Sequence, residues 1–217
     1  MAPRKGAAPP EAPRDCPLCP RLVAYREANA RAEPAWFNGA APSFGDPDAE
    51  LLVVGLAPGR TGANRTGRPF TGDYAGELLY GTLKKFGFAK GDYRADPDDG
   101  FTLWRAMITN AVRCAPPENK PTPAEIATCR PFLAARLAAL PKLRVLLALG
   151  AIAHESVLRA HDLKPTAAKF AHAAEAALPG GRTLLSSYHC SRYNTQTRRL
   201  TTEMFEAVFA RAKKLLA

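Results

Sequence analysis

A glycine-rich, basic loop groups several side chains suited to ligand recognition. The loop runs from Gly55 to Asp73 and follows directly on the apolar run Leu51 to Val54. Among five glycines and three arginines it holds the polar Asn64, the flat ring of Phe70 and the carboxylate of Asp73. Ligands of α/β proteins bind just beyond the carboxyl ends of strands, and glycine lets the backbone approach them closely. Arginine favours an anionic ligand. We therefore predict that this loop is a binding site, with an ordinary long loop as the alternative.

A phosphate-binding loop of the nucleoside triphosphate hydrolases is the first specific possibility. Gly62 to Pro69 has the two-glycine spacing of that motif. However, Arg68 stands where the motif requires lysine, and Pro69 replaces the hydroxyl that would bind Mg²⁺. The sequence therefore disfavours nucleotide hydrolysis.

Four of the five cysteines have a spacing that suits a metal site. Cys16 and Cys19 form a C-x-x-C pair, and Cys114 and Cys129 lie far along the chain. Cys190 stands apart from these four, beside a histidine. Four thiolates suit either zinc or an iron–sulfur cluster, and the spacing does not decide between them. Small buried core residues are the remaining alternative.

Alternating apolar segments predict the framework that positions these residues. Apolar runs predict buried strands, and segments with helical spacing lie between them. The pair Thr122 and Glu125 forms a capping box that predicts a helix start. Strands alternating with helices predict an α/β fold, a three-layer αβα sandwich around a short four-stranded parallel sheet. The four expected strands are residues 51–56, 106–112, 144–149 and 183–186.

This topology brings distant polar residues to one edge of the sheet. Asn110 lies near the carboxyl end of the second strand, and His189 follows the fourth. Both should face the glycine-rich loop, which follows the first. The segment after His189 mixes rings, amides and arginines, which suits contact with nucleic acid. Its candidate residues are Arg192, Tyr193, Asn194, Arg198 and Arg199.

Composition bounds the class of protein. The chain has 217 residues, ordinary hydrophobic content and a formal net charge of +10, which favours a polyanionic partner such as nucleic acid. Residues 1–15 are rich in proline and alanine and predict a flexible tail before a single domain over 16–217. No apolar run reaches the length of a membrane span, so we expect a cytoplasmic protein that acts as a monomer without a membrane partner.

Four motifs in one order resemble the uracil-DNA glycosylase superfamily, specifically the family 5 (type b) iron–sulfur enzymes. They are CPLCPRLVAYRE, GLAPGRTGANRTGRPFTGD, ITNAVRCAPPENKPTPAEIATC and SYHCSRYNTQTRRLT. Family 4 enzymes usually carry an acid in the GEAPG motif, where this chain has Leu56. The resemblance covers nearly the whole chain after the tail. It implies removal of uracil, and of other deaminated bases such as hypoxanthine or xanthine, from DNA.

The resemblance also implies a [4Fe-4S] cluster on Cys16, Cys19, Cys114 and Cys129. Cys190, in a position where many relatives have proline, is not expected to be a fifth ligand.

The resemblance further implies catalytic roles for Asp73, Asn110 and His189. Phe70 would stack on the flipped base, while the backbone around Gly55 and Ala57, together with Asn64 and Asn194, would complete the substrate site. Ala57 stands where other branches of the superfamily carry a polar side chain. The competing hypothesis is a non-catalytic nucleic-acid binding module stapled by a metal.

Overall fold

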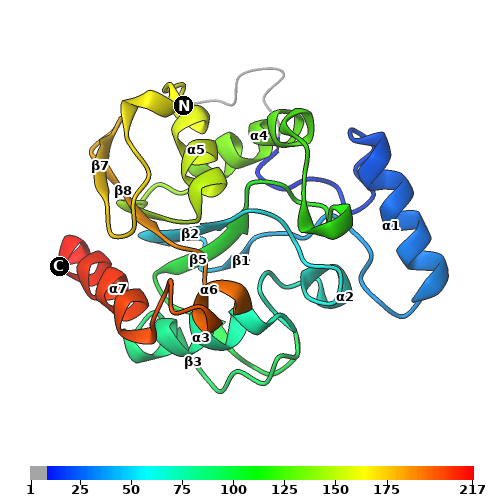
Figure 1. The fold of residues 1–217 in the computed structure, drawn as a ribbon, viewed down its shortest axis with the longest axis horizontal. Coiled ribbons are helices and arrows are strands. Elements are labelled where there is room, and N and C mark those ends of the chain that lie inside the picture. Colours follow the sequence, from blue (N-terminus) through cyan, green and yellow to red (C-terminus); the bar gives the residue numbers. More distant parts are fainter. Residues whose placement is uncertain (1–8) are drawn as a thin grey trace.

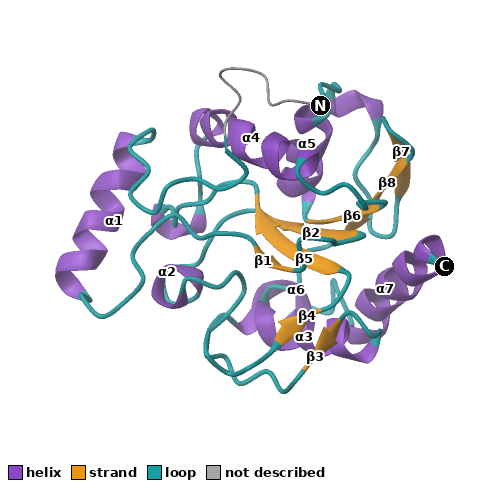
Figure 2. Cartoon of the chain, turned by 180° about the vertical axis from the view of Figure 1, so that it is seen from behind, coloured by secondary structure: helices purple, strands orange, loops and turns teal. Residues whose placement is uncertain are grey.

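A six-stranded mixed sheet forms the centre of the protein in a computed structural model that describes residues 9–217 (Figures 1 and 2). Its order is β1-β5-β2-β6-β8-β7, and the four inner strands are parallel. Both edge strands, β1 and β7, pair antiparallel to their neighbours. The strands are β1 (Phe44–Gly45), β2 (Leu51–Gly55), β5 (Ala106–Asn110), β6 (Val145–Leu149), β7 (Glu175–Leu178) and β8 (Arg182–Ser187).

Helices cover both faces of this sheet and make the three-layer sandwich (Figure 1). α4 (Pro123–Ala138) and α5 (Ala151–Ala160) pack on one face, and α3 (Tyr74–Lys85) and α7 (Thr202–Leu216) pack on the other. Each face has its own apolar core, because strands such as β2 bury residues on both sides. The expected αβα architecture is therefore confirmed. The remaining elements are α1 (Pro20–Ala32), α2 (Ala63–Thr66), β3 (Ala89–Lys90), β4 (Thr102–Leu103), η1 (Pro117–Asn119), η2 (Pro165–Ala167) and α6 (Arg192–Gln196).

Local signals in the sequence set several element boundaries. Thr122 accepts a hydrogen bond from the Glu125 backbone, and the Glu125 side chain accepts one from Thr122, so the expected capping box starts α4. The four expected strands match the four parallel ones to within one or two residues. The fourth, β8, is an inner strand, because β7 pairs along its outer side.

The expected tail is partly ordered. Residues 1–8 of that segment lie outside the described residues. Glu11 accepts hydrogen bonds from the buried Arg113 and from Arg136, and Arg14 donates to the carbonyl oxygen of Phe37. The buried Arg113 and the partly buried Arg136 thus contact Glu11 within the segment that the sequence predicts to be flexible.

The parallel strands deliver their carboxyl ends to one edge of the sheet. Gly55, the last residue of β2, pairs in register with Asn110, the last residue of β5. His189 follows the end of β8 by two residues. None of the described helices is long and apolar enough to cross a membrane.

Candidate functional site

A cavity of about 510 Å³ opens at the carboxyl edge of the sheet. Of the residues expected in the site, it brings together six. Its polar and aromatic lining comes from the loop after β2, from the start of α3, from the ends of β5 and β8, and from α1. The expected residues in its lining are Ala57, Phe70, Asp73, Asn110, His189 and Arg192. We call this the main cavity.

Asn110 supplies a buried amide at the base of the main cavity. Its side chain is 3% exposed, and its Oδ1 atom has no hydrogen-bond partner in the structure of residues 9–217. A buried oxygen without a partner costs free energy unless a ligand donates to it. Gly55 makes room for this arrangement, since a Cβ there would lie 2.4 Å from Asn110 Oδ1 and 2.7 Å from the Phe70 ring. Gly55 therefore acts by its missing side chain.

Phe70 and His189 form an aromatic wall. Their rings are stacked, with centroids 5.9 Å apart and planes 25° apart. Burial lowers the pKa of His189 to about 4, so its imidazole is neutral at pH 7 and can donate one hydrogen bond. The Asn194 amide donates to the His189 carbonyl oxygen at 2.8 Å and so fixes the backbone that carries the imidazole.

Asp73 presents a carboxylate that its own helix does not use. Asp73 is the N-cap of α3, yet its side chain makes no capping hydrogen bond. The carboxylate instead lies against the backbone of Gly59 and Gly62, where a Cβ would come within 2.7 Å and 2.0 Å of its oxygens. Burial raises the pKa of Asp73 to about 6, against the opposing charge of Arg65. It is the only acid among residues 9–217 that the loop after β2 brings to the main cavity.

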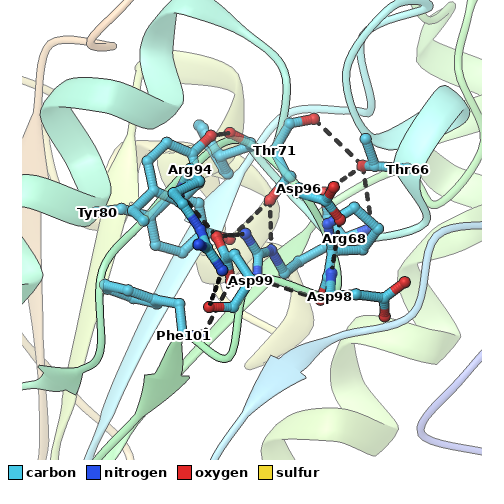
Figure 3. Close-up of polar contacts among 12 residues, drawn as sticks. Thr66, Arg68, Thr71, Tyr80, Arg94, Asp96, Asp98, Asp99 and Phe101 are labelled. Atoms are coloured by element: carbon cyan, nitrogen blue, oxygen red, sulfur yellow. Dashed lines mark hydrogen bonds and ion pairs between the residues drawn. The ribbon is translucent and has the colours of Figure 1, made fainter.

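A buried ion pair between Arg68 and Asp99 stabilises the glycine-rich loop (Figure 3). The Nη1 and Nη2 atoms of Arg68 each donate to one carboxylate oxygen of Asp99 at 2.8 Å. Its Nε donates to the Thr71 hydroxyl at 2.6 Å. The Arg68 side chain is 4% exposed, so this arginine is engaged inside the protein and does not line the main cavity. This pair holds the pKa of Asp99 well below its usual range. Asp99 comes from the polar segment 90–100, in which the sequence indicated no supporting role.

Two tyrosines continue this support up to Phe70. The Tyr80 hydroxyl donates to the Pro69 carbonyl oxygen at 2.5 Å, and the Tyr93 hydroxyl donates to the Phe70 carbonyl oxygen at 3.3 Å. The two phenol rings are stacked with centroids 4.5 Å apart, and the Arg68 guanidinium faces both of them. Phe70 itself has a φ of 57°, a left-handed conformation that costs free energy and needs such support.

Three residues expected to contact substrate are absent from the lining of the main cavity, namely Gly55, Asn64 and Asn194. Asn64 is buried in α2 and donates to the Asn38 side chain at 3.0 Å, because its helix faces the loop after α1. Asn194 is turned toward the His189 carbonyl, as described above. Both amides therefore hydrogen-bond to neighbouring loops of the protein.

The expected DNA-binding residues lie on the surface around α6. Tyr193 is 70% exposed. Arg192 lies over the Tyr74 ring, and Arg199 lies over the Tyr188 ring. Arg198 is exposed and has a positive φ of 57° in the turn after α6. These side chains project from the edge that carries the main cavity.

Sequence reasoning missed several lining residues. Glu118 and Asn119 form a turn with φ of 54° and 57° beyond the end of β5, and Tyr25 enters from α1. Their position after a strand that ends in Asn110 is a signal that could have identified Glu118 and Asn119. Tyr25 carries no such signal, since only the tertiary packing of α1 brings it near. The remaining missed polar and aromatic lining residues are Arg60, Thr61, Tyr74 and Ser191.

The four cysteines expected to bind metal line a second, smaller cavity. Cys16, Cys19, Cys114 and Cys129 meet there with apolar neighbours from α1 and α4. Burial raises the pKa of Cys114 to about 12 and that of Cys129 to about 11, and neighbouring cysteines add to both shifts. No group of three or more histidine, cysteine or acidic side chains among residues 9–217 is arranged to hold a metal ion by itself. We call this the cysteine cavity.

Two hydrogen bonds and one buried charge act on these sulfurs. The Arg113 backbone N–H donates to Cys129 Sγ at 3.3 Å, and the Arg26 guanidinium donates to Cys114 Sγ at 3.7 Å. Arg26 is 9% exposed and forms no ion pair with a carboxylate of the described chain. Cys190 is absent from this cavity and packs in the core beneath α3.

Comparison with known proteins agrees with the motifs. Residues 42–213 match the family model of the uracil DNA glycosylase superfamily. A type-5 uracil-DNA glycosylase of Thermus thermophilus is 50% identical over 206 residues, covering 92% of this chain and 93% of its own. A type-5 enzyme of Mycobacterium bovis is 42% identical over 92% of this chain and 78% of its own length. A type-4 enzyme of Pyrobaculum aerophilum is 32% identical over 67% of this chain and 60% of its own. The chain therefore belongs to the uracil DNA glycosylase superfamily and, within it, to the type-5 glycosylases.

Proposed function

We propose that this protein is a DNA-repair glycosylase that hydrolyses the N-glycosidic bond of uracil in DNA. The observation that carries the proposal is the buried Asn110 amide, whose Oδ1 atom lacks a partner at the base of the main cavity. Uracil presents an N–H donor beside a carbonyl acceptor, which an asparagine amide can bind with both of its polar atoms. Cytosine presents the opposite pattern and could pair with this amide only if the side chain turned its oxygen and nitrogen around.

The target nucleotide must leave the helical stack to reach this amide. Flipping costs a few kcal/mol, and a mismatched or damaged pair reduces that cost. Phe70 offers a ring on which the extrahelical base stacks, and the exposed Tyr193 is placed to fill the gap left in the duplex. The arginines around α6 supply charge for the phosphate backbone.

Cleavage separates charge, and the site has a group for each sign. The C1′–N1 bond breaks with its electron pair on the base, while positive charge develops on the sugar. The neutral His189 imidazole donates to the base oxygen that becomes anionic. The Asp73 carboxylate stabilises the cationic sugar and orients the water whose oxygen bonds to C1′. The proton lost from that water balances the charge on the departing base.

We also propose hypoxanthine and xanthine as substrates. Each presents an N–H donor beside a carbonyl oxygen, which is the same edge that uracil offers to Asn110. Ala57 leaves that part of the lining without a bulky side chain, and the cavity volume of about 510 Å³ accommodates the larger ring system. We further propose that the protein acts as a monomer, because residues of one chain line the whole cavity.

The cysteine cavity suits a [4Fe-4S] cluster. Four thiols line one largely apolar space, and two of the sulfurs accept N–H donors, as is common for cluster ligands. The buried Arg26 lacks an acidic partner among the described residues, and cluster thiolates would supply that negative charge. Cys16, Cys19, Cys114 and Cys129 would hold the cluster. When bound, it would cross-link the start of α1 to the loop after β5 and to α4.

Incubation with oligonucleotides that each carry one lesion tests the activity. Alkali cleaves the strand wherever a base has been removed. We expect cleavage at uracil, and at hypoxanthine and xanthine, with none at cytosine. Binding to the same oligonucleotides without any cleavage would refute the glycosylase and favour the non-catalytic binding module. Cleavage at uracil alone would refute the extended substrate range.

A further inference from the structure

Arg60 is held at the main cavity by side chains from α1 and from the loop that follows it. Its Nε donates to the Asn29 side-chain oxygen at 2.8 Å, and Asn29 is buried in α1. The guanidinium carbon lies 4.8 Å from the centre of the Trp36 ring. Glu33 forms a long ion pair with its Nη2 atom at 3.9 Å. These contacts orient the guanidinium, and Arg60 lines the main cavity.

The other arginines of the loop are engaged elsewhere. Arg65 donates its Nε to the Thr61 carbonyl oxygen at 2.9 Å, and Arg68 is buried in its ion pair with Asp99. Of the three, Arg60 alone lines the main cavity in the part of the chain that the structure describes. Arg60 is thus the one arginine of this loop that is placed to meet the anionic partner that the loop composition indicated.

Arg192 repeats this arrangement on the α3 side of the cavity. Its guanidinium carbon lies 5.1 Å from the centre of the Tyr74 ring, and it also lines the cavity. The Tyr74 hydroxyl is tied to the Thr195 hydroxyl at 3.3 Å. Two stacked arginines, one on the α1 side and one on the α3 side, thus line the main cavity.

We propose that Arg60 and Arg192 form a phosphate clamp. They bind the phosphodiester groups on either side of the nucleotide whose base occupies the cavity. A planar guanidinium matches two phosphate oxygens, and stacking on a ring orients it in advance, so less conformational entropy is lost on binding. This proposal rests on the proposed function and adds Arg60 to the DNA contact surface.

Salt dependence of binding gives the test. The probe is a duplex with 2′-fluorodeoxyuridine, whose glycosidic bond resists hydrolysis, so binding is measured without base release. We expect Arg60→Gln to raise the Kd about fivefold and to reduce the slope of log Kd against log salt by about one. Arg60→Gln combined with Arg192→Gln should reduce the slope by about two, because two phosphate contacts are lost.

Lys213→Gln is the matched control. Lys213 is exposed near the end of α7, across the molecule from α1 in Figure 1, and its loss changes the net charge equally. We expect it to leave the slope unchanged. An Arg60→Gln variant that matches this control would overturn the clamp. So would a weaker Kd with an unchanged slope, which would mean that Arg60 contacts the base and not a phosphate. A wild-type protein that binds the probe but releases no uracil from ordinary uracil-containing DNA would refute the glycosylase proposal separately.

Discussion

The Tyr93 hydroxyl lies 3.3 Å from the Phe70 carbonyl oxygen and 3.4 Å from the Gly72 backbone nitrogen. One phenol thus bridges the segment between the stacking ring and the Asp73 carboxylate. Gly76 makes this possible, since a Cβ there would lie 1.9 Å from the Phe70 oxygen and 2.6 Å from the phenol oxygen. Tyr93 and Gly76 therefore help to fix the positions of Phe70 and Asp73.

Removing that hydroxyl should impair catalysis more than stability. We expect Tyr93→Phe to lower the single-turnover rate of uracil release about tenfold, while the lost hydrogen bond lowers the free energy of unfolding by about 1 kcal/mol. Thr82→Val is the control, because it removes a buried hydroxyl bonded to the Leu78 carbonyl inside α3. Equal rate losses in both variants would show that Tyr93 has no positioning role.

Truncating either of the two proposed catalytic side chains should be costly. We expect Asp73→Ala and His189→Ala each to slow uracil release about a hundredfold or more, on the order of ~3 kcal/mol of transition-state stabilisation. Single-turnover kinetics at saturating enzyme measure this directly. A variant that retains a near-normal rate would remove its residue from the mechanism.

The rate should depend on pH through Asp73. Its pKa is raised to about 6 by burial, and the carboxylate form is the active one, so the rate should fall as the pH drops through about 6. His189, with a pKa lowered to about 4, stays neutral through that range and adds no second limb there. Asp73→Asn should abolish the acidic limb. A limb that persists unchanged in this variant would assign it to another group.

A single methyl group should displace the carboxylate. The Cβ in Gly59→Ala would lie 2.7 Å from an Asp73 oxygen, and the side chain would have to move. Since misplacement of about 1 Å can cost a hundredfold in rate, we expect a loss of that order. Gly81→Ala in α3 meets no atom within 4 Å and should raise the free energy of unfolding by roughly 0.5–1 kcal/mol without changing the rate. Thermal melts and single-turnover rates of the two variants distinguish these outcomes.

Loss of a cluster ligand should destabilise the fold. We expect the purified protein to be brown, with broad visible absorbance, and Cys129→Ala to lose both iron and thermal stability. Cys190→Ala removes a buried thiol outside the cysteine cavity and should keep the full iron content. A colourless protein with one zinc ion per chain would instead establish the rival metal.

Local patterns predicted the frame of this molecule better than its contacts. The apolar runs of β2, β5 and β6 identify strands buried on both faces, and the Thr122 capping box identifies the start of α4. The edge strands were missed because β1 has two residues and β7 lacks a continuous apolar run. Strands this short are defined by their partners and not by their own sequence.

The positions of some site residues could likewise be predicted from the sequence, and those of others could not. Asn110 could be placed because it ends a strand, and a strand end has a fixed position in a parallel sheet. Asn64 could not, because the loop composition does not show that it would turn toward Asn38. The pairing of Arg68 with Asp99 joins residues 31 positions apart through tertiary packing, so the sequence showed two charges and not one buried pair.

Helix α1 contacts both the cysteine cavity and the main cavity. Cys19 is its N-cap residue, and Arg26 donates to the Cys114 sulfur. Tyr25 lines the main cavity, and Asn29 accepts a hydrogen bond from Arg60. A change that displaces the cysteine end of α1 should therefore also displace Tyr25 and Arg60 at the main cavity. Loss of the metal would then weaken substrate binding, although no metal ligand needs to touch the DNA.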